Sequence, residues 1–335
     1  MKTDTLKKSL LDYAIKGKLT AKFRRENSEL SAFDELEIYN DKIKQKRKNL
    51  EKELNKCEKE FKLEKDKDKK ALFKSQIQSL KKEIVKCKEI TPLNLSEAPF
   101  EIPSTWAWVK LGDICEVTMG QSPEQSQFID FSPVSQAQND KKACHTERSE
   151  VSYFEFHQGK ILFGEKFIEK SNIFVKGAVK VANTNSILLC VRAPVGIVNI
   201  TQRKIAIGRG LCALKSEFCN NDLLYFILQS MQTYFEKKAT GSTFKAINID
   251  IVKQTLIPLP PLCEQQEIVK KLDLLVTLAN DFAITKENLK RIEKRIEKRI
   301  EKSLLKLALE GSLSKLYRRS SPTLSAFNEI NTYNE

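Results

Sequence analysis

Two changes in hydrophobic period divide this chain of 335 residues into three differently built stretches. Over residues 36–90, apolar residues recur at intervals of three, four and seven, the spacing of one face of an α-helix. At Pro92 this period stops, and short β-rich runs separated by turns continue as far as Pro261. A helical period returns over residues 268–296. We therefore expect an α+β fold, with one mixed α/β domain flanked by long helices whose narrow apolar stripes are typical of coiled coils.

Within these stretches the sequence predicts individual elements. Residues 1 to about 35 predict a helix followed by a polar turn. The charged break EKDKDKK at 64–70 favours two amphipathic helices folded into a hairpin, with a single continuous helix as the alternative. Residues 222–240 predict one well-formed helix, and the polar segment 131–152 predicts a surface loop or insertion. The expected strands lie in WVKLGDICEVT, GKILF, SILLCVRA, VGIVNIT and KIAIG.

The chain repeats its beginning near its end. SLLKLALEGSLSKLYRRSSPTLSAFNEINTYN at 303–334 aligns without a gap on SLLDYAIKGKLTAKFRRENSELSAFDELEIYN at 9–40. Between the two, residues 291–302 are three copies of R-I-E-K, whose isoleucines wind slowly round a helix and need a partner. We expect four parts: a helical hairpin or spacer at 1–92, the mixed domain at 93–262, a long helix at 263–312, and the start of a repeat at 313–335.

Composition limits the function without fixing it. The formal net charge of +14 fits a polyanionic partner such as nucleic acid, although solvated helix faces explain part of the lysine excess. The eight cysteines form no C-x-x-C pair, and most lie in apolar runs, where a free thiol behaves as a small core residue. No apolar run is long enough to span a bilayer, and we expect a reduced, cytoplasmic protein.

Motifs of catalysis are missing from the sequence. It has no phosphate-binding loop, no dinucleotide fingerprint, no H-E-x-x-H zinc motif, and no N-P-P-Y motif of the kind that amino-methyltransferases use. Of the two histidines, His145 fits a solvated loop and His157 fits a structural position better than a ligand-binding one. We therefore expect a non-catalytic protein without metal or cofactor, and binding as its function.

Six short stretches of the middle of the chain resemble one known family when they are taken in order. They are EIPSTWAWVKLGDICEVTMGQSP, FHQGKILFGE, LLCVRAPVGIVNIT, AIGRGLCAL, ATGSTFKAIN and IPLPPLCEQQEIVKKLD. This ordered set, flanked by long helices, resembles the specificity subunit of type I restriction-modification systems, and the resemblance covers practically the whole chain.

The resemblance implies a function and partners. In that family a target recognition domain reads one half of a split DNA sequence, and long helices act as spacers and as the docking surface for methyltransferase subunits. Members usually carry two recognition domains in tandem, so this chain resembles a half-size unit with a single one. The implied partners are double-stranded DNA, methyltransferase subunits, a restriction subunit and a second half, either an identical copy or a separately encoded one. Pairing of the two terminal helical regions within one chain is a third arrangement.

The resemblance also implies which loops meet DNA. Phosphate contacts position a protein on DNA, whereas side chains that meet base edges read the sequence. Small neighbours at Gly120, Gly159, Gly208, Gly210 and Gly241 would permit close backbone approach or positive φ. Each loop also has a purely structural alternative: a β-turn at 120–123, a buried Arg192, and an Arg209 that holds its own loop together. The candidate DNA-binding residues are Gln121, Ser122, Gln158, Lys160, Arg192, Arg209, Thr243 and Lys245.

Two other classes of function stay open at this point. One is a nuclease or methyltransferase whose catalytic residues are dispersed in the sequence. The other is a coiled-coil scaffold whose basic helices bind nucleic acid without sequence preference.

Overall fold

The computed structural model describes residues 3–63, 66–93, 98–129, 153–177, 179–241, 245–323 and 325–334. The chain divides into two compact units, one of residues 4–274 and one that holds residues 275–335 together with 1–3. The expected insertion at 131–152, including His145, lies outside the described residues.

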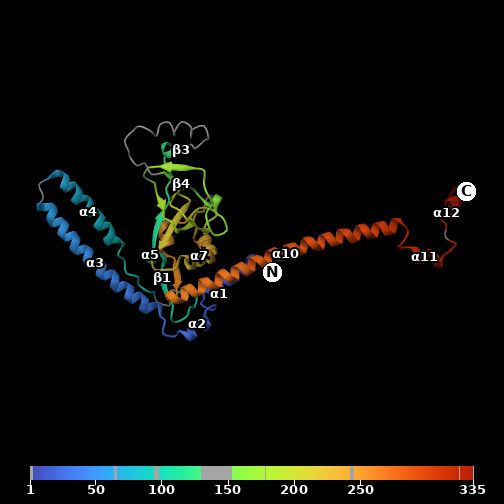
Figure 1. The fold of residues 1–335 in the computed structure, drawn as a ribbon, viewed down its shortest axis with the longest axis horizontal. Helices are drawn as coiled ribbons and strands as arrows, with labels where there is room; N and C mark the ends of the chain where they lie inside the picture. Colours follow the sequence, from blue (N-terminus) through green and yellow to red (C-terminus); the bar gives the residue numbers. More distant parts are fainter. Residues whose placement is uncertain are drawn as a thin grey trace. The chain divides into compact units, whose positions relative to one another are not determined.

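The first unit begins with helices. They are α1 (Thr3–Ile15), α2 (Ala21–Glu26), α3 (Ala32–Leu63) and α4 (Lys67–Lys86) (Figure 1). The α2 helix occupies the basic cluster after Gly17, where the sequence predicted only a turn.

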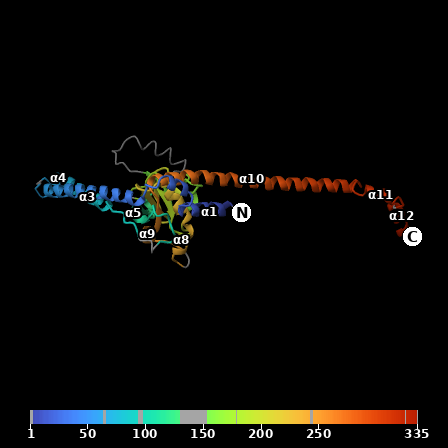
Figure 2. The ribbon, with the colours of Figure 1, turned by 90° about the horizontal axis from the view of Figure 1, so that it is seen from below.

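The helices α3 and α4 form an antiparallel hairpin, and both views show them side by side (Figure 2). Two ion pairs run across it, from Lys81 to Glu58 at 2.9 Å and from Lys44 to Glu89 at 3.6 Å. The base of the hairpin is closed by Asn40, whose side-chain amide donates to the Ile90 carbonyl and accepts from the Ile90 amide. A hairpin is therefore what the sequence builds here, and the alternative of one continuous helix is wrong.

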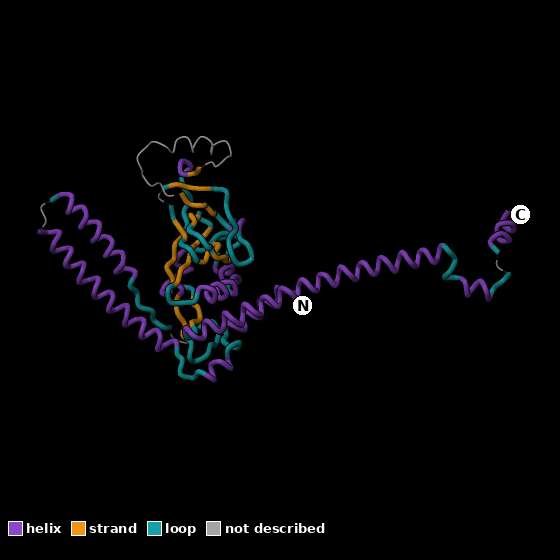
Figure 3. The backbone as a smooth tube through the Cα atoms, viewed as in Figure 1, coloured by secondary structure: helices purple, strands orange, loops and turns teal. Residues whose placement is uncertain are grey.

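Every strand of the described chain lies between residues 107 and 259 (Figure 3). One sheet is antiparallel, in the order β2-β10-β7-β8. The second has the order β3-β5-β4-β9-β6, in which β4 and β9 are parallel. The strands of the first sheet are β2 (Cys115–Met119), β10 (Leu211–Ser216), β7 (Ile187–Cys190) and β8 (Val198–Ile200). Those of the second are β3 (Phe128–Ile129), β5 (Phe174–Lys176), β4 (Tyr153–His157), β9 (Ile205–Ile207) and β6 (Val181–Ala182).

The main core cluster draws on strands of both sheets. It combines Leu188 and Leu211 of the first sheet with Ile205 and Ile207 of the second, each at most 1% exposed. Short buried strands of β-branched and aliphatic residues pack in this way because both of their faces are covered. The α+β class predicted from the sequence is confirmed.

A small two-stranded sheet of β1 (Ala107–Lys110) and β11 (Leu256–Leu259) joins this central domain to its flanking helices. The described part of the domain also contains the short helices α7 (Asn221–Ser230), α8 (Gln232–Lys238) and α9 (Ile249–Gln254). Residues 223–228 of α7 are all buried. The diproline after β11 then starts α10 (Leu262–Leu309), a helix of 48 residues.

Three of the predicted elements are wrong in detail. Residues 111–114 of WVKLGDICEVT form the helical turn α5 (Leu111–Ile114), which separates β1 from β2. The run GKILF is a 3-10 turn (Lys160–Leu162) and not a strand. The helix predicted over 222–240 is divided at Met231 into α7 and α8. Local hydrophobicity does not fix which regular structure a short run adopts, nor that it is buried, since Ile161 of the 3-10 turn is 93% exposed.

The second unit contains most of α10, followed by α11 (Lys315–Ser320) and α12 (Ala326–Asn334). The isoleucines of the R-I-E-K repeats, Ile292, Ile296 and Ile300, are about half exposed, at 50–53%. In the first unit, by contrast, Ile268 and Leu272 of the same helix are buried.

The cysteines behave as the sequence predicted. All seven of those described are free thiols, and five of them are buried. Among the described helices, none combines the length and apolar character required to cross a membrane.

Candidate nucleic-acid interface

Several strand ends meet at one edge of the two sheets. In the first sheet β2 and β7 each run antiparallel to β10, so their carboxyl ends lie beside the start of β10. In the second sheet β4 and β9 are parallel, so their carboxyl ends also lie together. Residues 208–210 connect the end of β9 directly to the start of β10. The loops that follow four strands are therefore gathered at a single edge.

Backbone hydrogen bonds tie these loops to one another. The Gly208 amide donates to the His157 carbonyl at 2.8 Å, and the Gln121 amide donates to the Ile207 carbonyl at 3.0 Å. A fifth loop joins them, because the Ala193 amide donates to the Lys245 carbonyl at 3.1 Å. Five segments that are far apart in the sequence thus form one surface.

Glycine makes this close approach possible. A Cβ atom on Gly210 would lie 2.3 Å from the Gln158 carbonyl oxygen, and one on Gly120 would lie 2.1 Å from the Gly208 carbonyl oxygen. Backbone atoms cannot move away from such contacts as a flexible side chain can. The prediction of close approach is confirmed at these positions and at Gly208, and Gly241 has the predicted positive φ. It is wrong at Gly159, where an added Cβ atom would meet no atom within 4 Å and φ is extended at −166°.

The joined loops enclose a pocket of about 180 Å³. Its lining contains four of the residues that the sequence singled out, Gln158, Lys160, Arg192 and Arg209. The remaining lining residues are Gly159, Cys190, Ala193, Pro194 and Gly210. The lining holds three cations and one amide and includes no carboxylate.

The polar side chains of this pocket are available to a ligand. Gln158, Lys160, Arg192 and Arg209 are all exposed. Within the described part of the chain, no carboxylate pairs with the three cations. Guanidinium and ammonium groups donate hydrogen bonds to phosphate oxygens and to guanine O6 and N7, and a carboxamide matches adenine. The pocket therefore has the chemistry of a contact with a polyanion that carries nucleobases.

The exposure of Arg192 excludes its structural alternative, a buried arginine beneath the Pro194 turn. The β-turn alternative at 120–123 is also wrong, because the backbone of residues 120–124 forms neither a turn nor a bend.

Of the other four candidate DNA-binding residues, the three that the structure describes do not line the pocket. Gln121 and Lys245 are exposed and are joined to the loops of the pocket through their backbones. Ser122 is exposed but does not line the pocket. Thr243 lies outside the described residues.

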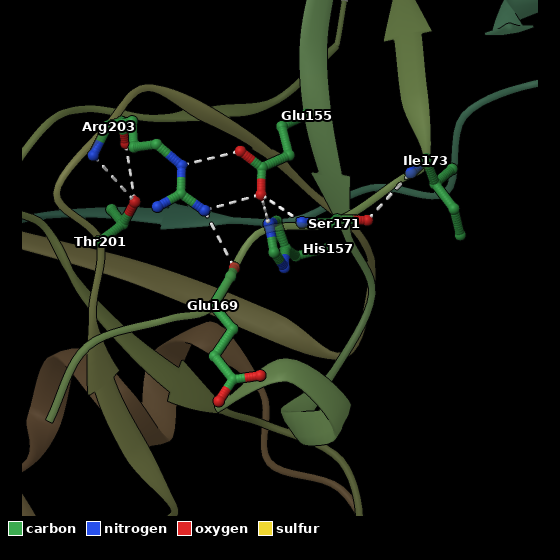
Figure 4. Close-up of polar contacts among 7 residues, drawn as sticks. All are labelled: Glu155, His157, Glu169, Ser171, Ile173, Thr201 and Arg203. Atoms are coloured by element: carbon green, nitrogen blue, oxygen red, sulfur yellow. Dashed lines mark hydrogen bonds and ion pairs between the residues drawn. The ribbon is translucent and has the colours of Figure 1, made fainter. Parts of the chain in front are cut away.

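A partly buried polar network surrounds Glu155 of β4, the strand that leads to Gln158 (Figure 4). The Glu155 carboxylate of β4 accepts two hydrogen bonds from the Arg203 guanidinium, at 2.8 and 2.7 Å. It also accepts from the Ser171 amide at 2.6 Å and lies 2.8 Å from Nε2 of His157. Arg203 in turn donates to the Glu169 carbonyl at 2.9 Å. The network ties the end of β4 to the turn between β8 and β9 and to the segment before β5.

The network fixes the charges of its members. Burial alone would raise the pKa of Glu155, but the hydrogen bonds from Arg203, the Ser171 amide and His157 outweigh burial and lower the pKa to about 2. Burial lowers the pKa of His157, despite the attraction of Glu155. His157 is 3% exposed, in keeping with the structural position that the sequence favoured. The Glu155–Arg203 pair could not be predicted from the sequence, because isolated charged residues in a β-rich stretch are typical of a protein surface.

Comparison with known proteins assigns the family. Residues 103–294 match the family model of the type I restriction modification DNA specificity domain. This match covers more than half of the chain, and the chain belongs to this family.

Two relatives from Methanocaldococcus jannaschii are similar over the same part. The protein named as the MjaX specificity subunit of a type I restriction enzyme is 33% identical over 195 residues, which are 57% of this chain and 41% of the relative. The type I restriction enzyme MjaIX specificity subunit is 26% identical over 197 residues, which are 57% of this chain and 43% of the relative. The chain thus matches less than half the length of these relatives.

Two solved structures are also similar to the chain. The HsdS subunit from Thermoanaerobacter tengcongensis has a TM-score of 0.45 and 23% identity, over 75% of this chain and 51% of that one. A chain from the structural study of complex assembly and conformational transition of the type I R-M system has a TM-score of 0.47 and 26% identity. That similarity covers 79% of this chain and 56% of the other.

Proposed function

We propose that this chain reads one half of a bipartite DNA target as the non-catalytic specificity component of a type I restriction-modification complex. The observation that carries the proposal is the gathering of Gln158, Lys160, Arg192 and Arg209 around one exposed pocket that no carboxylate neutralises. We take the domain at 93–262 as the recognition domain, and the helices at 1–92 and 263–312 as spacers that dock methyltransferase subunits.

The proposed division of labour within the interface follows the chemistry of each group. Arg192 and Arg209 would donate to guanine edges or phosphates, and Gln158 would pair with adenine. Lys160, Lys245 and Gln121 would hold the flanking backbone. Ser122 and Thr243 complete the proposed set, and in the sequence Thr243 lies between Gly241 and Lys245.

The proposal that the chain is non-catalytic rests on the nature of the groups at the pocket. Its exposed polar side chains are cations and an amide, which are neither general bases nor activated nucleophiles. Burial raises the pKa of the Cys190 thiol at its floor to about 12, so it stays protonated at neutral pH. The purified chain alone should neither bind S-adenosylmethionine nor cut DNA in the presence of magnesium, and either activity would favour the enzymatic alternative.

We further propose partners beyond DNA. The half-exposed isoleucines of the long helix fit pairing with a second half-subunit, identical or separately encoded, and a restriction subunit would join the assembled complex. Double-stranded DNA as the ligand also implies the cytoplasm as the place of action.

The test is sequence-selective binding. Duplexes selected from a random library should share a short motif, and Arg209→Ala and Arg192→Ala should each weaken binding by about 1–3 kcal/mol. Lys215→Ala is the matched control, because Lys215 is exposed near the far end of β10, the strand that starts at the pocket. It should leave the selected motif unchanged. Affinity that is equal for all duplex sequences would contradict the proposal and favour a nonspecific scaffold.

A further inference from the structure

The described residues of the two copies of the repeated segment, 9–40 and 303–334, share their helix boundaries and the turn at the glycine. Gly17 and Gly311 stand at equivalent positions, and both have φ of +68°. The short helices α2 and α11 begin and end at equivalent residues, as do the starts of α3 and α12. The repeat is therefore conserved in structure as well as in sequence.

The same side chains also organise both copies. In the first copy Arg24 donates to the Gly17 carbonyl and to the Thr20 hydroxyl, the latter at 3.1 Å. In the second copy Arg318 donates to the Gly311 carbonyl at 2.5 Å and to the Ser314 hydroxyl at 2.6 Å. In each copy, therefore, a hydroxyl residue is hydrogen-bonded to the arginine four positions later, and the same arginine is hydrogen-bonded to the glycine carbonyl.

In the first copy this pair is docked on what we call the cradle, formed by Trp106 and Glu264. The side chain of Glu264 is 1% exposed and accepts from Thr20 at 2.5 Å, from Arg24, and from the Trp106 indole at 2.7 Å. The Arg24 guanidinium also lies over the Trp106 ring, 5.6 Å from its centroid. A buried carboxylate requires such partners, because its desolvation is otherwise uncompensated.

Three more contacts fix the first copy around the cradle. Glu35 accepts from the Leu262 amide at the start of α10, at 2.8 Å. The Tyr39 ring packs edge-on against Phe218 with centroids 4.9 Å apart. Asn40 makes its two hydrogen bonds with Ile90.

The second copy keeps the residues that make these contacts, at equivalent positions: Ser314, Arg318, Glu329, Tyr333 and Asn334. The second copy also has apolar residues at the positions that are buried in the first copy, but there they are exposed to solvent. Leu11 and Leu36 are 4% and 1% exposed, whereas their counterparts Leu305 and Ile330 are 57% and 58% exposed. Tyr333 is 92% exposed. The cradle at Trp106 and Glu264 is filled by the first copy, so the second copy has to find another.

We propose that residues 303–334 are a docking segment for a second recognition domain, one that carries a Trp and a buried Glu in the positions of Trp106 and Glu264. This inference rests on the proposed function and names a contact through which two recognition domains are joined. Ser314 and Arg318 would bind the glutamate of that domain. Glu329 would accept a hydrogen bond from a backbone amide in the first turn of the helix that contains this glutamate. Leu305 and Ile330 would be buried in the contact.

A chimera of the full chain tests whether the second copy can dock. Residues 9–40 are replaced by the sequence of 303–334, so that one molecule holds two identical copies and only the first has a cradle beside it. Trypsin cleavage at the Arg-Arg pair is then followed separately in each copy. We expect cleavage in the first copy to be at least about tenfold slower, because cleavage there requires local opening of the docked segment.

The Glu264→Gln chimera is the matched control, and it should remove most of this protection while leaving cleavage of the second copy unchanged. Equal rates at the two copies, or a chimera that does not fold, would overturn the proposal. DNA binding of the same chimera is measured in parallel. Loss of protection with DNA binding intact would refute this inference alone and leave the proposed function standing.

Light scattering then tests the contact between molecules. Arg24→Glu places a like charge beside Glu264, so it should expel the first copy and open the cradle. We expect this variant to self-associate at micromolar concentration and the double variant Arg24→Glu/Arg318→Glu to lose that association at least about tenfold. Association that is absent, or that survives the second substitution, would contradict docking through Arg318.

Discussion

Arg203 and Glu155 form a two-pronged ion pair: Nε of Arg203 lies 2.8 Å from Oε2 of Glu155, and Nη2 lies 2.7 Å from Oε1 (Figure 4). The pair joins β4 to the turn between β8 and β9. This turn connects the two sheets, because β8 belongs to the first sheet and β9 to the second. The pair thereby fixes the strand that leads into the Gln158 loop. We therefore expect the geometry of the candidate DNA-binding pocket to depend on this pair, although neither residue lines the pocket.

Glu155→Gln should destabilise the chain by about 1–3 kcal/mol, because it leaves the Arg203 guanidinium and the Ser171 amide with weaker partners. The measurement is the free energy of unfolding in urea at pH 7. Glu169→Gln is the matched control: the Glu169 side chain is exposed, and its backbone carbonyl, not its carboxylate, accepts from Arg203. A loss as large in the control would show that the pair is not the cause.

The same network predicts loss of stability in acid. Because burial lowers the pKa of His157 from its ordinary 6.5, the unfolded chain binds the proton more readily, and stability falls as the pH drops below about 6.5. The pKa of Glu155 is lowered from 4.5 to about 2, so a further loss follows below pH 4.5.

Urea midpoints measured between pH 8 and pH 3.5 should show both steps. His157→Gln should remove the first step and Glu155→Gln the second. A wild-type midpoint that stays constant over this range would contradict the assignment of these two groups.

The cysteines give a prediction that needs no DNA. Burial raises the pKa of Cys190, Cys212 and Cys219 to about 12, and the thiolate is the form that reacts with alkylating agents. At pH 8 these three thiols should react with iodoacetamide at least about tenfold more slowly than the exposed Cys263. Mass spectrometry of the peptides follows the alkylation of each thiol separately. The same reaction in urea gives the alkylation rate of each thiol in the unfolded chain, where it is not buried. Equal rates in the native chain would show that the strands of the central domain open readily.

The sequence predicts those elements of the fold whose local residue pattern fits a single regular structure. The strands β7, β8 and β9 are predicted correctly, because runs of β-branched and aliphatic residues bounded by turns leave few alternatives. Lys160–Leu162 is predicted wrongly, since an apolar run of that length also fits a 3-10 turn. The helical hairpin is predicted because its break is marked by a run of charges.

The candidate site shows the same limit more sharply. The sequence and the family resemblance marked Gln158, Lys160, Arg192 and Arg209 individually, but only the pairing of β4 with β9 and of β7 with β10 brings these loops together. The hydrophobic period of a segment predicts that it is a strand, but it does not predict which other strand it pairs with. The cradle at Trp106 and Glu264 was likewise missed, although the repetition of a hydroxyl residue and an arginine in both copies was a signal for it.

Two glycines of the pocket provide the sharpest test of its packing. Gly210→Ala would place a Cβ atom 2.3 Å from the Gln158 carbonyl oxygen, a backbone atom that cannot move without shifting its loop. Gly159→Ala would add the same methyl group to the same pocket at a position with open space around it and an extended backbone.

We expect Gly210→Ala to cost about 1–3 kcal/mol of stability and to weaken binding to a selected duplex, because the loops carrying Gln158 and Arg209 must separate. Gly159→Ala should change the stability by no more than about 0.5 kcal/mol. Urea unfolding and fluorescence anisotropy with the same duplex measure the two effects. If Gly159→Ala weakens binding as much as Gly210→Ala while the stability stays unchanged, the methyl group is meeting the DNA itself, and the close packing of the loops is not the cause.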